Sequence, residues 1–198
     1  MKAWPVVAAV LTVAAGRLNS QTLPSNSAAE FSLGAPVADF TVTDMNGQAF
    51  KYSSLAGKAT VVIFFSTRCP MSNAFNYRRN KLYLDFAGRV NFIVIDPNAN
   101  ESIDEVRAYA RTAEFDFPVY KDAGNVVADR FGAQITTDTF VIDASGVIRY
   151  HGYLEDSPNE SRVKNQGLRR AIEAVLDGRP VAMPEGKAFG CSIRRVRP

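Results

Sequence analysis

The sequence predicts one α/β domain with a mixed β-sheet and helices on both of its faces. Two almost continuous apolar runs, at residues 59–66 and 90–96, are typical of strands that are covered on both sides. Segments with apolar residues at helical spacing separate these runs, and a hairpin pattern followed by a final helix comes after them. The expected order of the central elements is therefore β-α-β-α-β-β-α.

Each remaining element follows from apolar periodicity that is bounded by turn or capping residues. In the first predicted helix, Phe75, Leu82 and Phe86 share one side. We expect Arg78 and Arg79, on the other side, to face water. The other predicted elements are strands at 40–44, 48–52, 117–120, 140–143 and 147–151 and helices at 73–87, 102–113, 122–131 and 162–177. The first two of these strands are expected to form an N-terminal hairpin.

The composition limits the class of protein. The chain has 198 residues, of which 46% are hydrophobic and 22% are charged, and these values are ordinary for a globular domain. The net charge of +3 is too small to indicate nucleic-acid binding. Two cysteines are too few for a disulfide scaffold or a four-cysteine zinc site, and the sequence implies no organic cofactor.

The N-terminus predicts an export signal. Lys2 precedes an almost wholly apolar stretch at 3–15, and small residues follow where a signal peptidase could cut. The alternatives are an uncleaved anchor and a fortuitous apolar start. We expect a signal peptide at 1–20, a linker at 21–32, a folded domain at 33–180 and a C-terminal tail at 181–198. Export to the periplasm or outside the cell would place both cysteines where disulfides persist.

The predicted site is built around Cys69. This residue follows the buried strand at 59–66 and precedes a helix whose first turn suits Pro70. Unpaired amide groups at a helix N-terminus favour the thiolate, and Arg68 adds a neighbouring positive charge. We therefore expect Cys69 to be a reactive nucleophile. The alternative is an inert cysteine that packs as a small hydrophobe.

Several motifs agree in order and spacing with one known superfamily. They are Phe40-x-x-x-Asp44-x-x-Gly47, Leu55-x-Gly57-Lys58, Cys69-Pro70, Asp122-x-x-Gly124-x-Val126-x-x-x-Arg130-Phe131-Gly132 and Thr139-Phe140-Val141-Ile142-Asp143-x-x-Gly146. On these motifs, residues 33–178 resemble the thioredoxin superfamily and, within it, the redoxin group of AhpC/TSA-like and TlpA-like proteins. The resemblance implies a thioredoxin-like fold with an N-terminal β-hairpin and an inserted helix and strand. It also implies a thiol-dependent oxidoreductase.

Two short motifs are similar to those of an exported redoxin subgroup with a C-terminal cysteine. They are Cys69-Pro70-Met71-Ser72-Asn73 and Phe189-Gly190-Cys191-Ser192-Ile193. The predicted catalytic residues are therefore Cys69 and Cys191. The predicted supporting residues are Ser66, Arg68, Pro70, Ser72 and Thr137.

Three positions depart from the patterns of the superfamily. Ser72 stands where a dithiol thioredoxin has its second cysteine, and its hydroxyl could hydrogen-bond the Cys69 thiolate. Thr137 stands where thioredoxins have a cis-proline that faces the cysteine. Val62 and Ser66 replace the proline and threonine that precede the cysteine of peroxiredoxins. The resemblance thus implies exchange with a thiol reductant or a disulfide protein, and at most weak reduction of peroxide.

Cys191 lies on a tail without helical periodicity, which we expect to form an irregular strap with few buried contacts. Three roles stay open for it: a resolving thiol, one half of a permanent structural disulfide with Cys69, and a lone thiol. His151 is the only histidine, and a copper site would combine it with Cys69 and another soft ligand. An oxidoreductase without a metal site is the main hypothesis. A non-catalytic redoxin-like domain and a metal-handling protein are the alternatives.

Overall fold

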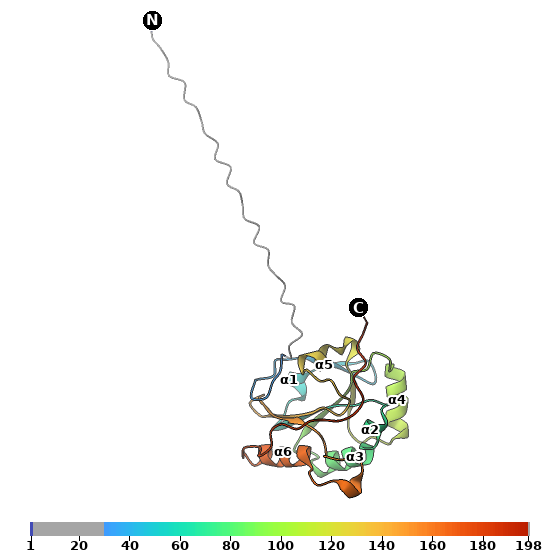
Figure 1. Cartoon of the computed structure of the whole chain (residues 1–198). Helices are drawn as coiled ribbons and strands as arrows, with labels where there is room; N and C mark the ends of the chain where they lie inside the picture. The colour runs from blue at the N-terminus through green and yellow to red at the C-terminus, as the bar shows by residue number, and fades with distance from the viewer. Residues whose placement is uncertain (2–29, 198) are drawn as a thin grey trace.

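One mixed β-sheet carries the fold (Figure 1), and its seven strands are in the order β2-β1-β5-β4-β3-β6-β7. The strands are β1 (Thr41–Asp44), β2 (Ala49–Lys51), β3 (Ala59–Phe64), β4 (Asn91–Asp96), β5 (Val119–Lys121), β6 (Thr139–Asp143) and β7 (Ile148–Gly152). β1 and β2 form the predicted hairpin. The computed structural model describes Met1 and residues 30–197, and the structural statements that follow concern this part of the chain.

Helices cover both faces of the sheet, as the sequence predicts. They are α1 (Tyr52–Leu55), α2 (Pro70–Asn73), α3 (Asn76–Asp85), α4 (Ile103–Thr112), α5 (Val126–Arg130) and α6 (Gly167–Leu176). Leu82 of α3, Val106 of α4 and Ile172 of α6 belong to one core cluster. Tyr52 of α1 and Val127 of α5 belong to the other. Figure 1 accordingly shows α3 and α6 on one side of the sheet and α1 and α5 on the other.

β3 is the strand that leads to Cys69, and it lies in the centre of the sheet. It pairs in parallel with β4 and antiparallel with β6, and all of its residues are buried. Val61 and Ile63 pack into the cluster with α3 and α6, whereas Val62 and Phe64 pack into the other cluster. This two-sided burial is what the apolar run predicts, and it holds the end of β3 rigidly in place.

Two helices differ from the prediction in their bounds. The helix expected at 73–87 is divided into α2 and α3, because Cys69 caps a first turn that ends at Ala74 before the buried Phe75 starts the second. The helix expected at 162–177 begins only at Gly167. Asp156 is the reason, because its carboxylate accepts a hydrogen bond from the Lys164 amide at 2.9 Å and holds the preceding segment out of the helix.

Arg78 and Arg79 do not face water, so the prediction for them is wrong. Arg79 is 1% exposed, and Arg78 is 9% exposed. Arg78 forms a buried ion pair with Glu155 at 2.9 Å. Both guanidinium groups also lie against aromatic rings, that of Arg78 at 4.7 Å from the centre of Phe75 and that of Arg79 at 5.7 Å from the centre of Phe65. Partners from distant parts of the chain therefore allow these cations to be buried.

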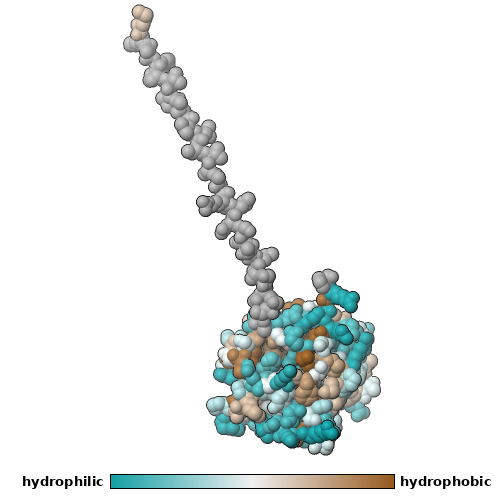
Figure 2. Space-filling view, viewed as in Figure 1, coloured by the Kyte–Doolittle hydropathy of each residue, from teal (hydrophilic) through white to brown (hydrophobic). Residues whose placement is uncertain are grey.

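The surface of the domain is mixed in character. Figure 2 shows one face on which polar side chains interrupt the apolar areas. None of the helices in the described part has the length and apolar character to span a bilayer. The predicted signal peptide and most of the predicted linker lie outside the described residues. Phe31, at the end of that linker, is buried, and its amide donates a hydrogen bond to the Arg130 carbonyl.

Candidate active site

Cys69 lies between the end of β3 and the start of α2, where the sequence predicts it. It is the N-cap residue of α2 in an extended conformation, and Pro70 occupies the first turn. Its sulfur forms a disulfide with Cys191, and the Cα atoms of the two residues are 5.9 Å apart. The structure therefore excludes a lone thiol at Cys191 and leaves a resolving thiol or a structural bridge.

Backbone amide groups surround the Cys69 sulfur. The Ser72 amide donates to Cys69 Sγ at 3.4 Å, and the Cys191 amide donates to it at 3.3 Å. The Ser72 hydroxyl has other partners, since its Oγ accepts from the Ser66 amide at 3.2 Å and lies 3.5 Å from Arg79. The hydrogen bond that we expect from the Ser72 side chain to the sulfur is thus made by its backbone. Two aligned amides favour a negative charge on Cys69.

Arg79 places a buried positive charge directly behind this turn. Its guanidinium donates to the Ser72 carbonyl at 3.3 Å and to Asn76 Oδ1 at 3.0 Å. In the described part of the chain its hydrogen bonds do not go to any carboxylate. Burial lowers the pKa of Arg79 to about 10, so the group stays charged at neutral pH. Sequence reasoning missed this residue because its helical position resembles that of a solvent-facing arginine.

A cluster of acidic groups lies behind the residues that precede Cys69. Glu101 accepts hydrogen bonds from the Ser66 hydroxyl and, at 2.7 Å, from the Thr67 amide. Burial raises the pKa of the neighbouring Asp96 to about 7. The Lys121 ammonium, 2.5 Å away, opposes this rise, whereas the negative charge of Glu101 adds to it. Glu101 thus holds the loop that carries Cys69. The sequence contains no signal for Glu101, which comes from a loop after β4.

Arg68, the predicted positive neighbour, points to a carboxylate. Its guanidinium donates to Glu105 at 2.6 and 2.7 Å, and its side chain is 54% exposed. The charge of Arg68 is therefore shared with an acid and screened by water. In this structure the Ser72 and Cys191 amides, not Arg68, donate to the Cys69 sulfur, and the buried Arg79 contacts Ser72.

The tail is bonded to the segment before β6 on both sides of Cys191. The Thr136 amide donates to the Cys191 carbonyl at 2.8 Å, and the Ile193 amide donates to the Gln134 carbonyl at 2.9 Å. Thr137, at the position of the cis-proline, donates through its hydroxyl to the Phe189 carbonyl at 2.7 Å. The tail thus pairs with this segment beside Cys69 as a short antiparallel strand would, through a bridge between Ile135 and Ser192.

The expectation of few buried contacts in the tail is wrong. Ala188 and Ile193 are 9% and 6% exposed. The ring of Phe189 lies 6.0 Å from that of Phe75. Further along, the Ala99 amide donates to the Arg194 carbonyl at 2.9 Å. Each of these contacts joins the tail to a segment far away in the sequence, which is why local periodicity did not reveal them.

Comparisons with known proteins agree with this geometry. The model of the AhpC/TSA family matches residues 33–151, which is more than half of the chain. The chain belongs to the AhpC/TSA family. It is 28% identical over 149 residues to the thiol-disulfide oxidoreductase ResA of Halalkalibacterium halodurans, covering 73% of this chain and 82% of that protein.

Two solved structures are similar over a larger part of the chain. A hypothetical protein from Sinorhizobium meliloti has 30% identity and a TM-score of 0.78, covering 85% of this chain and 97% of that one. An uncharacterized conserved protein from Geobacillus kaustophilus has 27% identity and a TM-score of 0.79, covering 85% and 94%. The predicted thioredoxin-like α/β fold is confirmed, as is the prediction of a thiol-dependent oxidoreductase. The roles of the individual site residues stay predictions.

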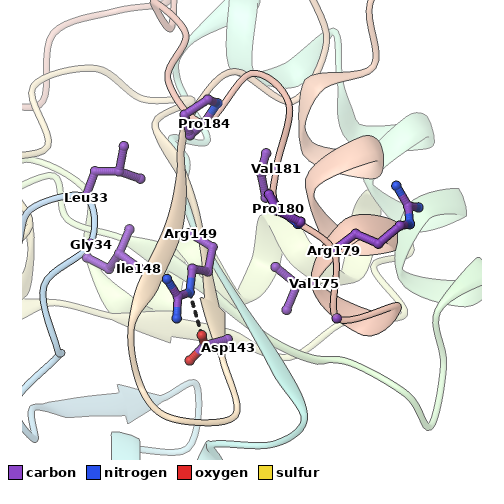
Figure 3. A pocket seen from close by; sticks show the side chains of 11 residues that line it. Leu33, Gly34, Asp143, Ile148, Arg149, Val175, Arg179, Pro180, Val181 and Pro184 are labelled. Carbon is purple, nitrogen blue, oxygen red and sulfur yellow. Dashed lines mark hydrogen bonds and ion pairs between the residues drawn. The ribbon is translucent and has the colours of Figure 1, made fainter.

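Two features lie outside this site. His151 stacks on Phe140, with ring centres 4.2 Å apart, and its Nε2 lies 3.3 Å from Asp138. No group of three metal-binding side chains occurs among the residues that the structure describes. A cavity of about 440 Å³ lies near the β6–β7 turn, where Arg149 pairs with Asp143 (Figure 3). Asp143 is opposite Ala59 in the sheet, so this cavity is at the end of β3 away from Cys69.

Proposed function

We propose that this protein is an exported thiol-disulfide oxidoreductase in which Cys69 and Cys191 alternate between a disulfide and two thiols. One observation carries the proposal. The sulfur of Cys69 caps a helix, accepts two amide hydrogen bonds and is bonded to a cysteine on the tail. Such a setting favours the thiolate form of Cys69. A thiolate is the nucleophile in thiol–disulfide exchange, and a stabilised thiolate is also a good leaving group. The name of the relative ResA supports the same activity.

The reaction transfers two electrons between the cysteine pair and a partner. In one direction, two thiols of a reductant become a disulfide while the Cys69–Cys191 bond is broken and both sulfurs are protonated. In the other, a substrate disulfide accepts the two electrons and the bridge forms again. Peroxide is a weaker candidate substrate, because the Ser66 hydroxyl is engaged by Glu101 and Cys69 is buried.

A structural bridge is the second candidate, and the docked tail favours it. Hydrogen bonds on both sides of Cys191 and the buried Ile193 would hold the tail even without the disulfide. A bridge of that kind would stabilise the domain and exchange with nothing. The two functions therefore require different reduction potentials of the Cys69–Cys191 bond.

A redox titration of the purified protein distinguishes them. The protein is equilibrated in glutathione buffers of known potential, quenched with acid and alkylated, and the fraction of free thiol is measured. An oxidoreductase gives one reversible two-thiol transition above about −300 mV, and it accelerates the reduction of insulin by dithiothreitol. The variants Cys69→Ser and Cys191→Ser are expected to lose that acceleration. A bridge that stays oxidised below about −300 mV and leaves insulin reduction unchanged would contradict the proposal.

The proposal includes export and a defined mature chain. It rests on the positive Lys2, the apolar stretch at 3–15 and the resemblance of the two cysteine motifs to an exported redoxin subgroup. We infer a domain at 33–180 and a tail at 181–198 that acts as part of the site. Cell fractionation with N-terminal sequencing checks this point. An intact Met1 on protein in the cytoplasmic fraction would contradict it.

A further inference from the structure

The two cysteines of the bridge differ in their exposure to solvent. Cys69 is 1% exposed, whereas Cys191 is partly exposed. We propose that the external thiol attacks Cys191 and not Cys69, so that the tail cysteine is the sulfur that meets the partner. This inference rests on the proposed function, because it requires a bridge that exchanges. It reverses the roles that the sequence predicts, in which Cys69 reacts with the partner and Cys191 resolves.

The direction of attack is the first argument. A thiolate approaches a disulfide sulfur along the S–S axis, from the side opposite the sulfur that leaves. Attack on Cys69 would come from the side away from Cys191. Cys69 has almost no exposed surface, so a partner has no open approach to it. Attack on Cys191 comes from outside the domain, where the neighbouring Ser192 is exposed.

The leaving group is the second argument. When Cys191 is attacked, Cys69 leaves as a thiolate, and its sulfur already accepts the amide hydrogen bonds of Ser72 and Cys191. A stabilised thiolate leaves faster. If the partner attacked Cys69 instead, Cys191 would have to be the leaving thiolate. The structure shows two N–H donors at Cys69 Sγ and, within the described residues, none at Cys191 Sγ.

The docked tail is the third argument. The Thr137 hydroxyl donates to the Phe189 carbonyl, and the Ile193 amide donates to the Gln134 carbonyl, so the tail is held on both sides of the reacting residue. These bonds do not involve either sulfur atom. After the first exchange the tail can therefore stay in place and keep Cys69 covered. The partner is then linked to Cys191 at the surface, on the outer side of the tail.

Reduction of the bridge takes two exchange steps. The partner thiolate forms a bond to Cys191 Sγ, the Cys69–Cys191 bond breaks, and Cys69 takes the electron pair as a thiolate. A second partner thiolate attacks the partner sulfur of the mixed disulfide and releases Cys191 as a thiolate and the partner as a disulfide. Both cysteines then take protons from water. The pair is reduced by two electrons, and two partner thiols are oxidised.

Peptide mapping of the oxidised full-length protein tests the site of attack. The protein is mixed with reduced glutathione, quenched in acid after seconds, denatured and alkylated with N-ethylmaleimide. We expect glutathione on Cys191 and maleimide on Cys69, in a ratio of at least about ten to one. The reverse pattern would overturn this inference and leave the proposed function intact. A bridge that no thiol reduces in the folded protein would overturn both.

Single-cysteine variants provide a second measurement in which the adduct cannot migrate between the two cysteines. Cys69→Ser protein keeps Cys191, and Cys191→Ser protein keeps Cys69 under the docked tail. We expect oxidised glutathione to modify Cys191 at least tenfold faster than Cys69 in the folded proteins, although Cys69 has the more stabilised thiolate. In urea sufficient to unfold both variants, the two rates should become similar. Faster modification of Cys69 in the folded state would overturn the inference.

Discussion

Arg79 is a buried cation that is held by carbonyl, hydroxyl and amide oxygens of the turn behind Cys69. A buried charge without a carboxylate partner is costly, and it becomes less so when a nearby group carries the opposite charge. The thiolate of Cys69, formed when the bridge opens, is such a group. We interpret Arg79 as a positioning residue that also favours this charge through Ser72.

The first prediction concerns the acidity of Cys69. In a Cys191→Ser background, Arg79→Met should raise the apparent pKa of Cys69 by about one unit, because the positive charge near the thiolate is lost. The alkylation rate measured against pH reports this value. Arg79→Lys should restore most of the difference, and Arg89→Met, which changes an exposed arginine, should have no effect. Equal pKa values in the Arg79→Met and Arg89→Met proteins would contradict the interpretation.

Asp96 leads to a prediction about pH and stability. Burial raises its pKa to about 7 from 3.8, so between about pH 4 and pH 7 the folded protein holds a proton that the unfolded chain has released. The free energy of unfolding therefore falls as the pH rises through this range. The loss attributable to Asp96 should be on the order of 2–4 kcal/mol.

Urea denaturation at a series of pH values checks this effect. Asp96→Asn should flatten the pH dependence between pH 4 and pH 7, whatever it does to the stability at any one pH. Asp104→Asn is the control, because that carboxylate is 80% exposed. Parallel pH profiles for wild type and Asp96→Asn would show that Asp96 ionises normally in the folded state.

At the scale of elements, the site is the meeting point of three segments. The end of β3 and the cap of α2 place Cys69, and the loop before β6 binds the tail that carries Cys191. Gly190 lets the tail come close to the segment before β6. A Cβ atom at position 190 would lie 3.0 Å from the Thr136 carbonyl oxygen and 3.0 Å from Ile135 Cγ2. The contact leaves little room for a side chain because one of these atoms belongs to the backbone.

The third prediction follows from that contact. Gly190→Ala should push the tail away from Thr136 and weaken the disulfide relative to the two thiols by roughly 1–3 kcal/mol, as other overpacked contacts do. A titration in glutathione buffers should show the oxidised fraction falling at a given ratio of thiol to disulfide. Ser192→Ala, a change at an exposed neighbour of Cys191, should leave the titration unchanged. An unchanged midpoint of this titration in Gly190→Ala protein would mean that the segment around Thr136 accommodates the methyl group without weakening the disulfide.

At the scale of the whole molecule, the bridge joins positions that are 122 residues apart. The strands from β4 to β7 and the helices from α2 to α6 therefore lie within one covalent loop, whereas β1, β2, α1 and β3 precede it. Closing a loop of this length restricts the unfolded chain far more than the folded one. The disulfide thus has a thermodynamic effect on the whole domain in addition to its proposed role in exchange.

The fourth prediction gives the size of that effect. Cys191→Ser should lower the free energy of unfolding by about 4–5 kcal/mol in the chain-entropy account. Cys69→Ser should cause a similar loss, because it opens the same loop. Urea midpoints of the oxidised wild type, the reduced wild type and both variants measure it. A loss below about 1 kcal/mol in both variants would show that the tail contacts, rather than the covalent loop, stabilise the domain.

The sequence by itself determined the elements whose causes are local. The apolar run of β3 predicts a strand that is covered on both faces, and the strand–Cys69–Pro70 corner predicts the cap of α2. Ser102 predicts the start of α4, where its hydroxyl accepts the Glu105 amide at 3.2 Å. Each of these features depends on residues within a few positions of one another. Periodicity and capping chemistry are therefore sufficient to predict them.

Only the tertiary structure decided the features that depend on distant partners. It pairs Cys69 with Cys191, buries Arg79 behind Ser72 and brings Glu101 to the loop before Cys69. With two cysteines in the chain the sequence offers Cys191 as the one possible partner of Cys69 but not whether they meet, and an arginine or a glutamate has the same local pattern whether it faces solvent or the interior. The free energy of burying a charge or closing a long loop depends on what surrounds it after folding. For that reason the sequence predicted the position of Cys69, and the fold determined that Cys69 is buried and Cys191 partly exposed.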